Sequence, residues 1–222
     1  MLRAIKQCPV FFAFLSLLLI AGISFCLYAS KLDSFTFLNF YHPLWLDNFF
    51  SYYTLMGDGI ITLVATLLLF FYKKKKAALI LFTAYLSSGI VVQLLKRLIS
   101  QPRPSLYFEQ ISFRYTHFVD GIIPMHSGSF PSGHTASAFA MATVLVLCLK
   151  NKRISLICLF TAALVGYSRI YLAQHFLQDV IAGAITGSIF GLLSFYLIQK
   201  AKPLKFDRIY QKKQPDYIQP TH

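Results

Sequence analysis

Three short segments of this chain carry the residue types that bind a phosphoryl group and transfer it. A phosphoryl group in transfer spreads negative charge over its oxygens, so it needs fixed cations and backbone N–H donors around it. It also needs a nucleophile and a proton donor for the leaving oxygen. The segments that hold these groups are Lys96 with Arg103-Pro104, Pro131-Ser132-Gly133-His134, and Ser168-Arg169 with His175 and Asp179.

Three cations and one helix start are the candidate phosphate ligands. Lys96, Arg103 and Arg169 supply positive charge, and the planar guanidinium of arginine can bind two phosphate oxygens at once. Ser132 and Gly133 precede an apolar run that predicts a helix, so the N–H groups there are the unpaired donors of a helix N-terminus. These five residues predict a pocket for a bound phosphate.

His175 and Asp179 are the candidate nucleophile and its positioning carboxylate. They are four residues apart at the predicted start of a helix, which places both side chains on one helix face. The carboxylate of Asp179 can hold one ring nitrogen of His175 in its N–H form and leave a lone pair on the other. His134 is then available to protonate the leaving oxygen and later to take a proton from water.

The sequence predicts that this chemistry needs neither a metal ion nor another cofactor. No cluster of carboxylates, cysteines or histidines has the spacing of a metal site, so the three cations would replace a metal. The four cysteines also lack a paired framework, and we expect four free thiols. They are Cys8, Cys26, Cys148 and Cys158.

The composition places these residues in a membrane protein. Of the 222 residues, 56% are hydrophobic and only 13% are charged, which is too apolar for an ordinary soluble domain. A spanning helix needs about 20 apolar residues. We therefore expect an all-α fold with six transmembrane helices, at residues 10–29, 54–72, 77–99, 134–149, 154–171 and 175–198.

Two segments near the N-terminus need a separate interpretation. Residues 40–53 are rich in Phe, Tyr and Trp, which suits the headgroup zone as an aromatic belt or as an interfacial helix. The first apolar stretch follows Arg3 and Lys6, as in a signal peptide, but it is long and no clear small-residue cleavage site ends it before Lys31. We expect this stretch to remain as a transmembrane helix.

The basic residues indicate the orientation. Six spans place 15 of the 21 lysines and arginines on one face, which the positive-inside rule makes cytoplasmic. Both termini then lie in the cytoplasm, and the candidate site lies on the opposite face. Division of the basic residues among short loops argues against nucleic-acid binding. These residues are Arg3, Lys6, Lys73 to Lys76, Lys150, Lys152, Arg153, Lys200, Lys202, Lys205, Arg208, Lys212 and Lys213.

We expect one membrane domain at residues 1–198, with an outer loop at about 100–131 over the site, and a flexible basic tail at 199–222. Asp58 lies between two glycines within the second apolar stretch, where a carboxylate is costly, and predicts a structural pairing or a helix break. A stripe of small residues, Gly183, Gly187 and Gly191, predicts close helix packing.

The three segments together resemble the signature of the type 2 phosphatidic acid phosphatase family, the vanadium haloperoxidase-like membrane lipid phosphatases. Every position of the signature between Lys96 and Asp179 matches. The resemblance implies a six-helix core and a phosphohistidine intermediate at His175, with His134 as proton donor. It also implies phosphate binding by Lys96, Arg103, Ser132, Gly133 and Arg169, and substrates that are lipid phosphates or diphosphates.

The substrate itself is less well defined by the sequence. Our leading hypothesis is a bacterial inner-membrane phosphatase that acts at the periplasmic face on undecaprenyl diphosphate, phosphatidylglycerol phosphate or lipid A phosphate. Its partners would be the lipid substrate and the bilayer, and no protein partner is evident. One alternative is a phosphotransferase that passes the phosphoryl group from His175 to a second lipid or to a sugar rather than to water. Another is a lipid-binding or transport protein, because polar clusters at helix ends also line transport paths.

Overall fold

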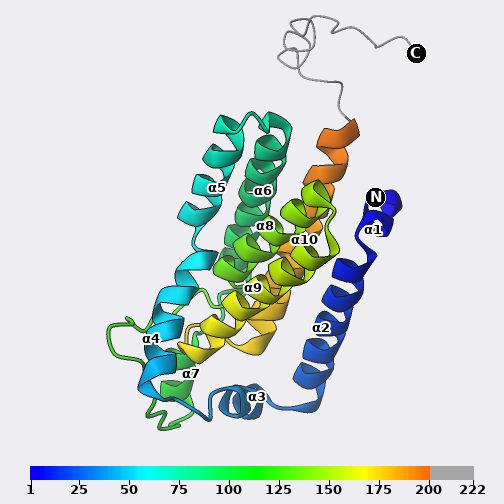
Figure 1. The fold of residues 1–222 in the computed structure, drawn as a ribbon. Helices are drawn as coiled ribbons and strands as arrows, with labels where there is room; N and C mark the ends of the chain where they lie inside the picture. The colour runs from blue at the N-terminus through cyan, green and yellow to red at the C-terminus, as the bar shows by residue number, and fades with distance from the viewer. Residues whose placement is uncertain (201–222) are drawn as a thin grey trace, which may run out of the picture.

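The computed structural model describes residues 1–200, and the described residues form helices and loops without a strand (Figure 1). The tail at 201–222 lies outside the described residues, so the predicted domain boundary is not tested there. The helices are α1 (Leu2–Gln7), α2 (Pro9–Tyr28), α3 (Lys31–Leu38), α4 (Leu44–Tyr53), the 3₁₀ helix η1 (Thr54–Gly57), α5 (Gly59–Phe71), α6 (Lys75–Ile99), α7 (Pro104–Gln110), α8 (Gly133–Leu149), α9 (Lys152–Tyr171) and α10 (Leu177–Lys200).

Four of the described helices, α2, α6, α9 and α10, are long and apolar enough to cross a membrane. A fifth candidate is a broken helix in which α4 and η1 form one part and α5 forms the other, with a bend of 52° between the two parts. The helix α8 is apolar but has only 17 residues. The chain is therefore an integral membrane protein with four or five candidate spans by length, where the sequence predicts six.

The second predicted span differs from the structure because the helix breaks at Asp58. This residue has an extended backbone, and its side chain accepts a 2.9 Å hydrogen bond from the N–H of Ile60. Asp58 is thus the N-cap of α5, as expected of a polar residue at a helix break. Residues 54–57 before it form η1, which continues the aromatic helix α4.

The helix α8 lies at the centre of the bundle and packs against α6, α9 and α10. The glycine stripe of α10 faces α8, as predicted. A Cβ on Gly183 would lie 2.5 Å from the carbonyl oxygen of Ser132, and one on Gly187 would lie 2.2 Å from that of Ala136. Glycine at these positions lets the two backbones touch, which fixes the start of α10 beside the start of α8.

The ends of the helices divide the molecule into two poles (Figure 1). At the lower pole in this view, the end of α6, the start of α8 and the turn from α9 to α10 come together with α3, α4 and α7. At the upper pole lie α1, the end of α10 and the turn between α5 and α6, which carries Lys73 and Lys74. The signature residues lie at the lower pole.

Candidate active site

His175 and Asp179 lie next to each other in the interior, although α10 begins later than predicted. His175 lies in the connection before α10, which starts at Leu177, so the two residues do not share a helix face. Its N–H instead donates to the carbonyl oxygen of Arg169, at 3.0 Å. The side chains still meet, because Nδ1 of His175 lies 3.6 Å from Oδ2 of Asp179. Both are almost fully buried, at 2% and 0% exposure.

Oδ2 of Asp179 is held from two further directions. The hydroxyl of Ser129 donates to it at 2.5 Å, and the N–H of Phe176 donates to it at 2.9 Å. The backbone of Asp179 also contacts the segment Pro131 to His134, because its carbonyl oxygen accepts from the N–H of Ser132 at 2.9 Å. The carboxylate is therefore fixed before any substrate binds, with one oxygen turned toward the imidazole.

The three cations are held in place mainly by neutral oxygen atoms rather than by ion pairs. Nζ of Lys96 donates to the carbonyl oxygen of Gly128 at 2.7 Å, which ties the end of α6 to the outer loop. Arg103, at 5% exposure, donates through Nε to the carbonyl oxygen of Ser127 and through Nη1 to both oxygens of Gln174.

Arg169 is buried in the same way at the end of α9. Its Nη1 donates to the hydroxyl of Thr54 at 2.7 Å, while Nε has no hydrogen-bond partner among the described residues. A buried donor without a partner is costly unless something else satisfies it. Lys96, Arg103 and Arg169 lie within electrostatic range of one another and of Asp179 or Asp58. This excess of buried positive charge favours a bound anion.

The electrostatic surroundings keep His175 neutral. Burial, reinforced by the positive charges of Arg103 and Arg169, lowers the pKa of His175 to about 3, against the opposing effect of Asp179. The imidazole therefore has an unprotonated nitrogen at neutral pH. Nδ1 has no hydrogen-bond partner among residues 1–200, because the distance of 3.6 Å to Asp179 is too long. Catalytic hydrogen bonds are often long before substrate binds.

His134 and Gly133 form the first turn of α8 at the edge of the same cluster. The hydroxyl of Ser132 caps this helix and accepts from Oγ1 of Thr135 at 2.8 Å. His134 lies within electrostatic range of Arg169, Arg103 and Lys96. The break in the second span brings Gly57 against it, since a Cβ on Gly57 would lie 3.0 Å from Cβ of His134. All eight predicted site residues thus gather at one pole.

Sequence reasoning missed three polar partners of the cluster: Ser129, Gln174 and Thr54. Ser129 and Gln174 stand near the signature, and their burial at 0% and 4% exposure is the structural sign of their role. Thr54 is 115 residues away from Arg169 along the chain. Within residues 1–200, no three His, Cys, Asp or Glu side chains are grouped so that they could share a metal ion.

A second buried polar network braces the outer loop against α9. Nδ1 of His42 lies 3.3 Å from Oδ1 of Asp47, and the same carboxylate oxygen accepts from the hydroxyl of Tyr171 at 2.6 Å. His42 stacks on His117 of the outer loop, with ring centroids 5.3 Å apart. Burial lowers the pKa of His42 despite the carboxylate.

Fold and site together define a helical membrane protein with a buried histidine–carboxylate pair among cations. The chain belongs to the PAP2 superfamily, whose family model matches residues 77–203, more than half of the chain and the whole of the signature. This finding confirms the family resemblance that the three segments indicate.

Individual relatives agree with this assignment. The chain is 34% identical over 116 residues to the lipid A 1-phosphatase of Rhizobium etli, covering 51% of this chain and 47% of that protein. It is 30% identical over 117 residues to the undecaprenyl-diphosphatase BcrC of Bacillus subtilis, covering 52% and 55%. The chain thus spans about half the length of these curated relatives. The crystal structure of Aquifex aeolicus LpxE is similar, with a TM-score of 0.66, 34% identity and coverage of 76% of this chain and 96% of that one.

Proposed function

We propose that this protein is an integral-membrane lipid phosphatase that hydrolyses a lipid phosphate or diphosphate through a phosphohistidine at His175. The observation that carries the proposal is the meeting of a neutral buried imidazole, a fixed carboxylate and three cations at one pole of the bundle. A carrier for lipids would need the cations but not the oriented imidazole.

In the first step, the lone pair on Nε2 of His175 attacks phosphorus. The bond between phosphorus and the lipid oxygen breaks, and that oxygen takes the proton of His134, which leaves a neutral His134. His175 becomes positively charged as the new N–P bond forms, and the carboxylate of Asp179 stabilises this charge through Nδ1–H. Lys96, Arg103, Arg169 and the N–H groups at Ser132 and Gly133 stabilise the charge on the phosphoryl oxygens.

In the second step, water attacks the phosphohistidine. His134 removes a proton from the water as the oxygen–phosphorus bond forms, and the N–P bond breaks to release inorganic phosphate and neutral His175. The cations, rather than a metal ion, balance the negative charge in both steps. The reaction is therefore proposed to be metal-independent and to use no cofactor.

The proposed substrate is a lipid that carries its phosphate at the outer surface of a bacterial inner membrane. The two curated relatives are named as phosphatases of lipid A and of undecaprenyl diphosphate, which supports this class of substrate. Phosphatidylglycerol phosphate belongs to the same class. We place the site at the periplasmic face because the basic turns lie at the other pole, with both termini in the cytoplasm.

This orientation requires six crossings in one membrane domain. We propose that α2, α6, α9 and α10 each cross, that α4, η1 and α5 form one broken crossing, and that α8 crosses despite its 17 residues because it is enclosed by other helices. The domain at 1–198 then contains the site and its outer loop at about 100–131.

A phosphate-release assay tests the proposal. Purified protein in detergent should release inorganic phosphate from a panel of lipid phosphates in the presence of a chelator. Vanadate should inhibit, because its trigonal-bipyramidal adduct resembles the transferring phosphoryl group. Absence of phosphate release from every lipid, or a complete requirement for added magnesium, would overturn the proposed reaction.

A further inference from the structure

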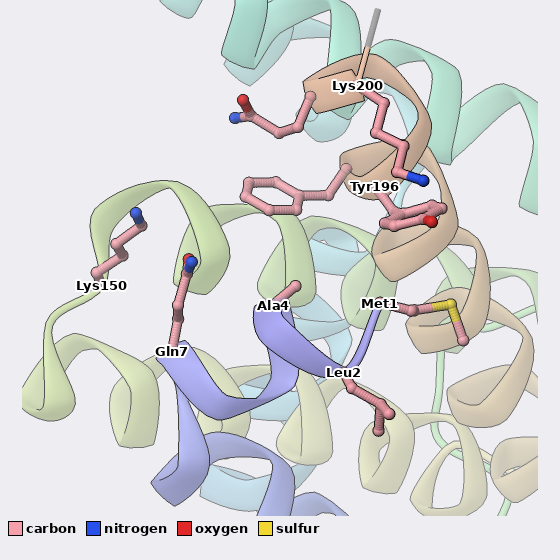
Figure 2. A pocket seen from close by; sticks show the side chains of 9 residues that line it. Met1, Leu2, Ala4, Gln7, Lys150, Tyr196 and Lys200 are labelled. Carbon is pink, nitrogen blue, oxygen red and sulfur yellow. The ribbon is translucent and has the colours of Figure 1, made fainter.

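A cavity of about 730 Å³ lies at the pole opposite the candidate active site (Figure 2). This volume falls within the range of ligand-binding pockets. Side chains from three separate parts of the chain surround it: α1, the turn from α8 to α9, and the end of α10. The lining residues are Met1, Leu2, Ala4, Gln7, Lys150, Phe195, Tyr196, Gln199 and Lys200.

The wall formed by α1 is anchored to the bundle. The chain turns sharply at Cys8, between α1 and Pro9 of α2, so that α1 lies beside the end of α10 (Figure 1). Ala4 and Cys8 are buried, at 6% and 5% exposure, and the thiol of Cys8 donates to the carbonyl oxygen of Val146 at 3.4 Å. These contacts fix α1 against the bundle, and Ala4 and Cys8 share a buried apolar cluster with Phe195.

Lysine side chains lie on two sides of the cavity. Lys150 ends α8 in the left-handed conformation, with φ of 53°, and its N–H donates to the carbonyl oxygen of Val146. Lys200 folds back so that Nζ lies 4.5 Å above the ring of Tyr196. Figure 2 shows Lys150 with Gln7 on one side and Lys200 with Tyr196 on the other. Among the described residues that line the cavity, none is acidic.

We propose that this cavity binds the headgroup of an anionic glycerophospholipid from the leaflet next to the basic turns. The lysine ammonium groups would pair with the lipid phosphate, and the amides of Gln7 and Gln199 would donate to its oxygens. Leu2 and Phe195 would cover the glycerol and the first chain carbons. Such apolar walls favour a phospholipid over free phosphate, which has no apolar part.

Charge also argues against the C-terminal segment as the occupant. Residues 201–222 contain Lys202, Lys205, Arg208, Lys212 and Lys213 against Asp207 and Asp216, so this segment has the same net sign as the cavity. An anionic lipid instead balances the charge of Lys150 and Lys200. The proposal does not rest on the phosphatase reaction, because the cavity lies at the opposite pole from His175.

Thermal unfolding of the full chain in neutral detergent tests the proposal. Phosphatidylglycerol, phosphatidylcholine and inorganic phosphate would each be added to the wild-type protein and to the double variant Lys150→Gln/Lys200→Gln. The double variant Lys73→Gln/Lys76→Gln is the matched control, because it removes the same charge from the same pole outside the cavity lining.

We expect phosphatidylglycerol to raise the Tm of the wild type and of the control by about 2–4 °C or more, and phosphatidylcholine to have little effect. The cavity variant should lose this shift while keeping its Tm without lipid and its phosphate release. An equal shift in both double variants would place the lipid elsewhere, including at the active site. An equal loss of the shift in both double variants would show that general surface charge binds the lipid. A shift with inorganic phosphate that is lost only in the cavity variant would show that the cavity binds free phosphate rather than a phospholipid.

Discussion

The hydroxyl of Ser129 donates a 2.5 Å hydrogen bond to the oxygen of Asp179 that faces His175. Ser129 is fully buried near the end of the outer loop, and its N–H donates to the carbonyl oxygen of Gln101 at the start of that loop. These contacts fix the position of its hydroxyl. We therefore regard Ser129 as a positioning residue for the carboxylate.

The variant Ser129→Ala should lower kcat by about 10- to 100-fold with little change in KM, since a hydrogen bond to a charged group is worth about 1.5–3 kcal/mol. Steady-state kinetics on a lipid phosphate measures both constants. Ser129→Thr should restore most of the activity because it keeps the hydroxyl. A purely structural role would instead lower Tm in the alanine variant and leave kcat of the folded fraction unchanged.

The roles proposed for the two histidines can be separated by trapping the intermediate. His175→Ala should form no acid-labile labelled phosphoenzyme from a labelled substrate. His134→Ala should still form it from a substrate with a good leaving group, because such a group needs little protonation. Label on the His175→Ala protein would mean that the nucleophile is another residue.

Asp179→Asn tests whether the carboxylate orients the imidazole. The amide keeps the size of the side chain but can present an N–H to Nδ1, which stabilises the wrong tautomer of His175. We expect turnover to fall by about ten-thousandfold, as when the corresponding carboxylate of a serine protease triad is replaced. Wild-type turnover with an unchanged Tm would contradict this assignment.

Acidification should weaken the fold through His175. Its pKa is about 3 in the folded chain and about 6.5 when exposed, so the unfolded chain binds more protons between these values. The stability present above pH 6.5 is therefore lost as the pH falls toward 3. Thermal unfolding at successive pH values should show a shallower decline for His175→Asn than for the wild type. His126→Asn, at an exposed loop position, should decline like the wild type.

Cysteine labelling tests the proposed orientation. Ser127 is exposed in the outer loop, whereas Lys152 is exposed at the turn between α8 and α9. A membrane-impermeant thiol reagent should label Ser127→Cys in intact spheroplasts and label Lys152→Cys only after lysis. The unsubstituted chain, with four free thiols of its own, gives the background. The opposite pattern would move the site to the cytoplasmic face.

The sequence predicted which residues come together at one pole because each motif lies at a helix end, where spacing along the chain determines position in space. Lys96 ends α6, His134 starts α8 and Arg169 ends α9, so these positions followed from the apolar runs alone. The contact between Arg169 and Thr54 was not predictable in this way, because it depends on how η1 packs against α9.

The limits of the fold prediction have a similar cause. Hydropathy marked residues 54–72 as one span, but the extended backbone of Asp58 divides it. Two glycines flank this aspartate, and that local signal did indicate the break. The start of α10 at Leu177 follows a turn in which the N–H groups of Gln174 and His175 both donate to the carbonyl oxygen of Arg169, and hydrophobic periodicity does not report such a turn.

The short lengths of α5 and α8 have a consequence for the path of the lipid. At 1.5 Å per residue, the 13 residues of α5 and the 17 of α8 extend about 20 and 26 Å, against about 30 Å of hydrocarbon. Both helices run from the site toward basic turns at the other pole. Measured from the basic turns, the starts of α5 and α8 therefore lie roughly 4 to 10 Å short of the outer edge of the hydrocarbon in the proposed orientation. The cations beside these starts are then recessed below the headgroups, so a lipid phosphate has to be drawn down from the outer surface into the protein to reach them.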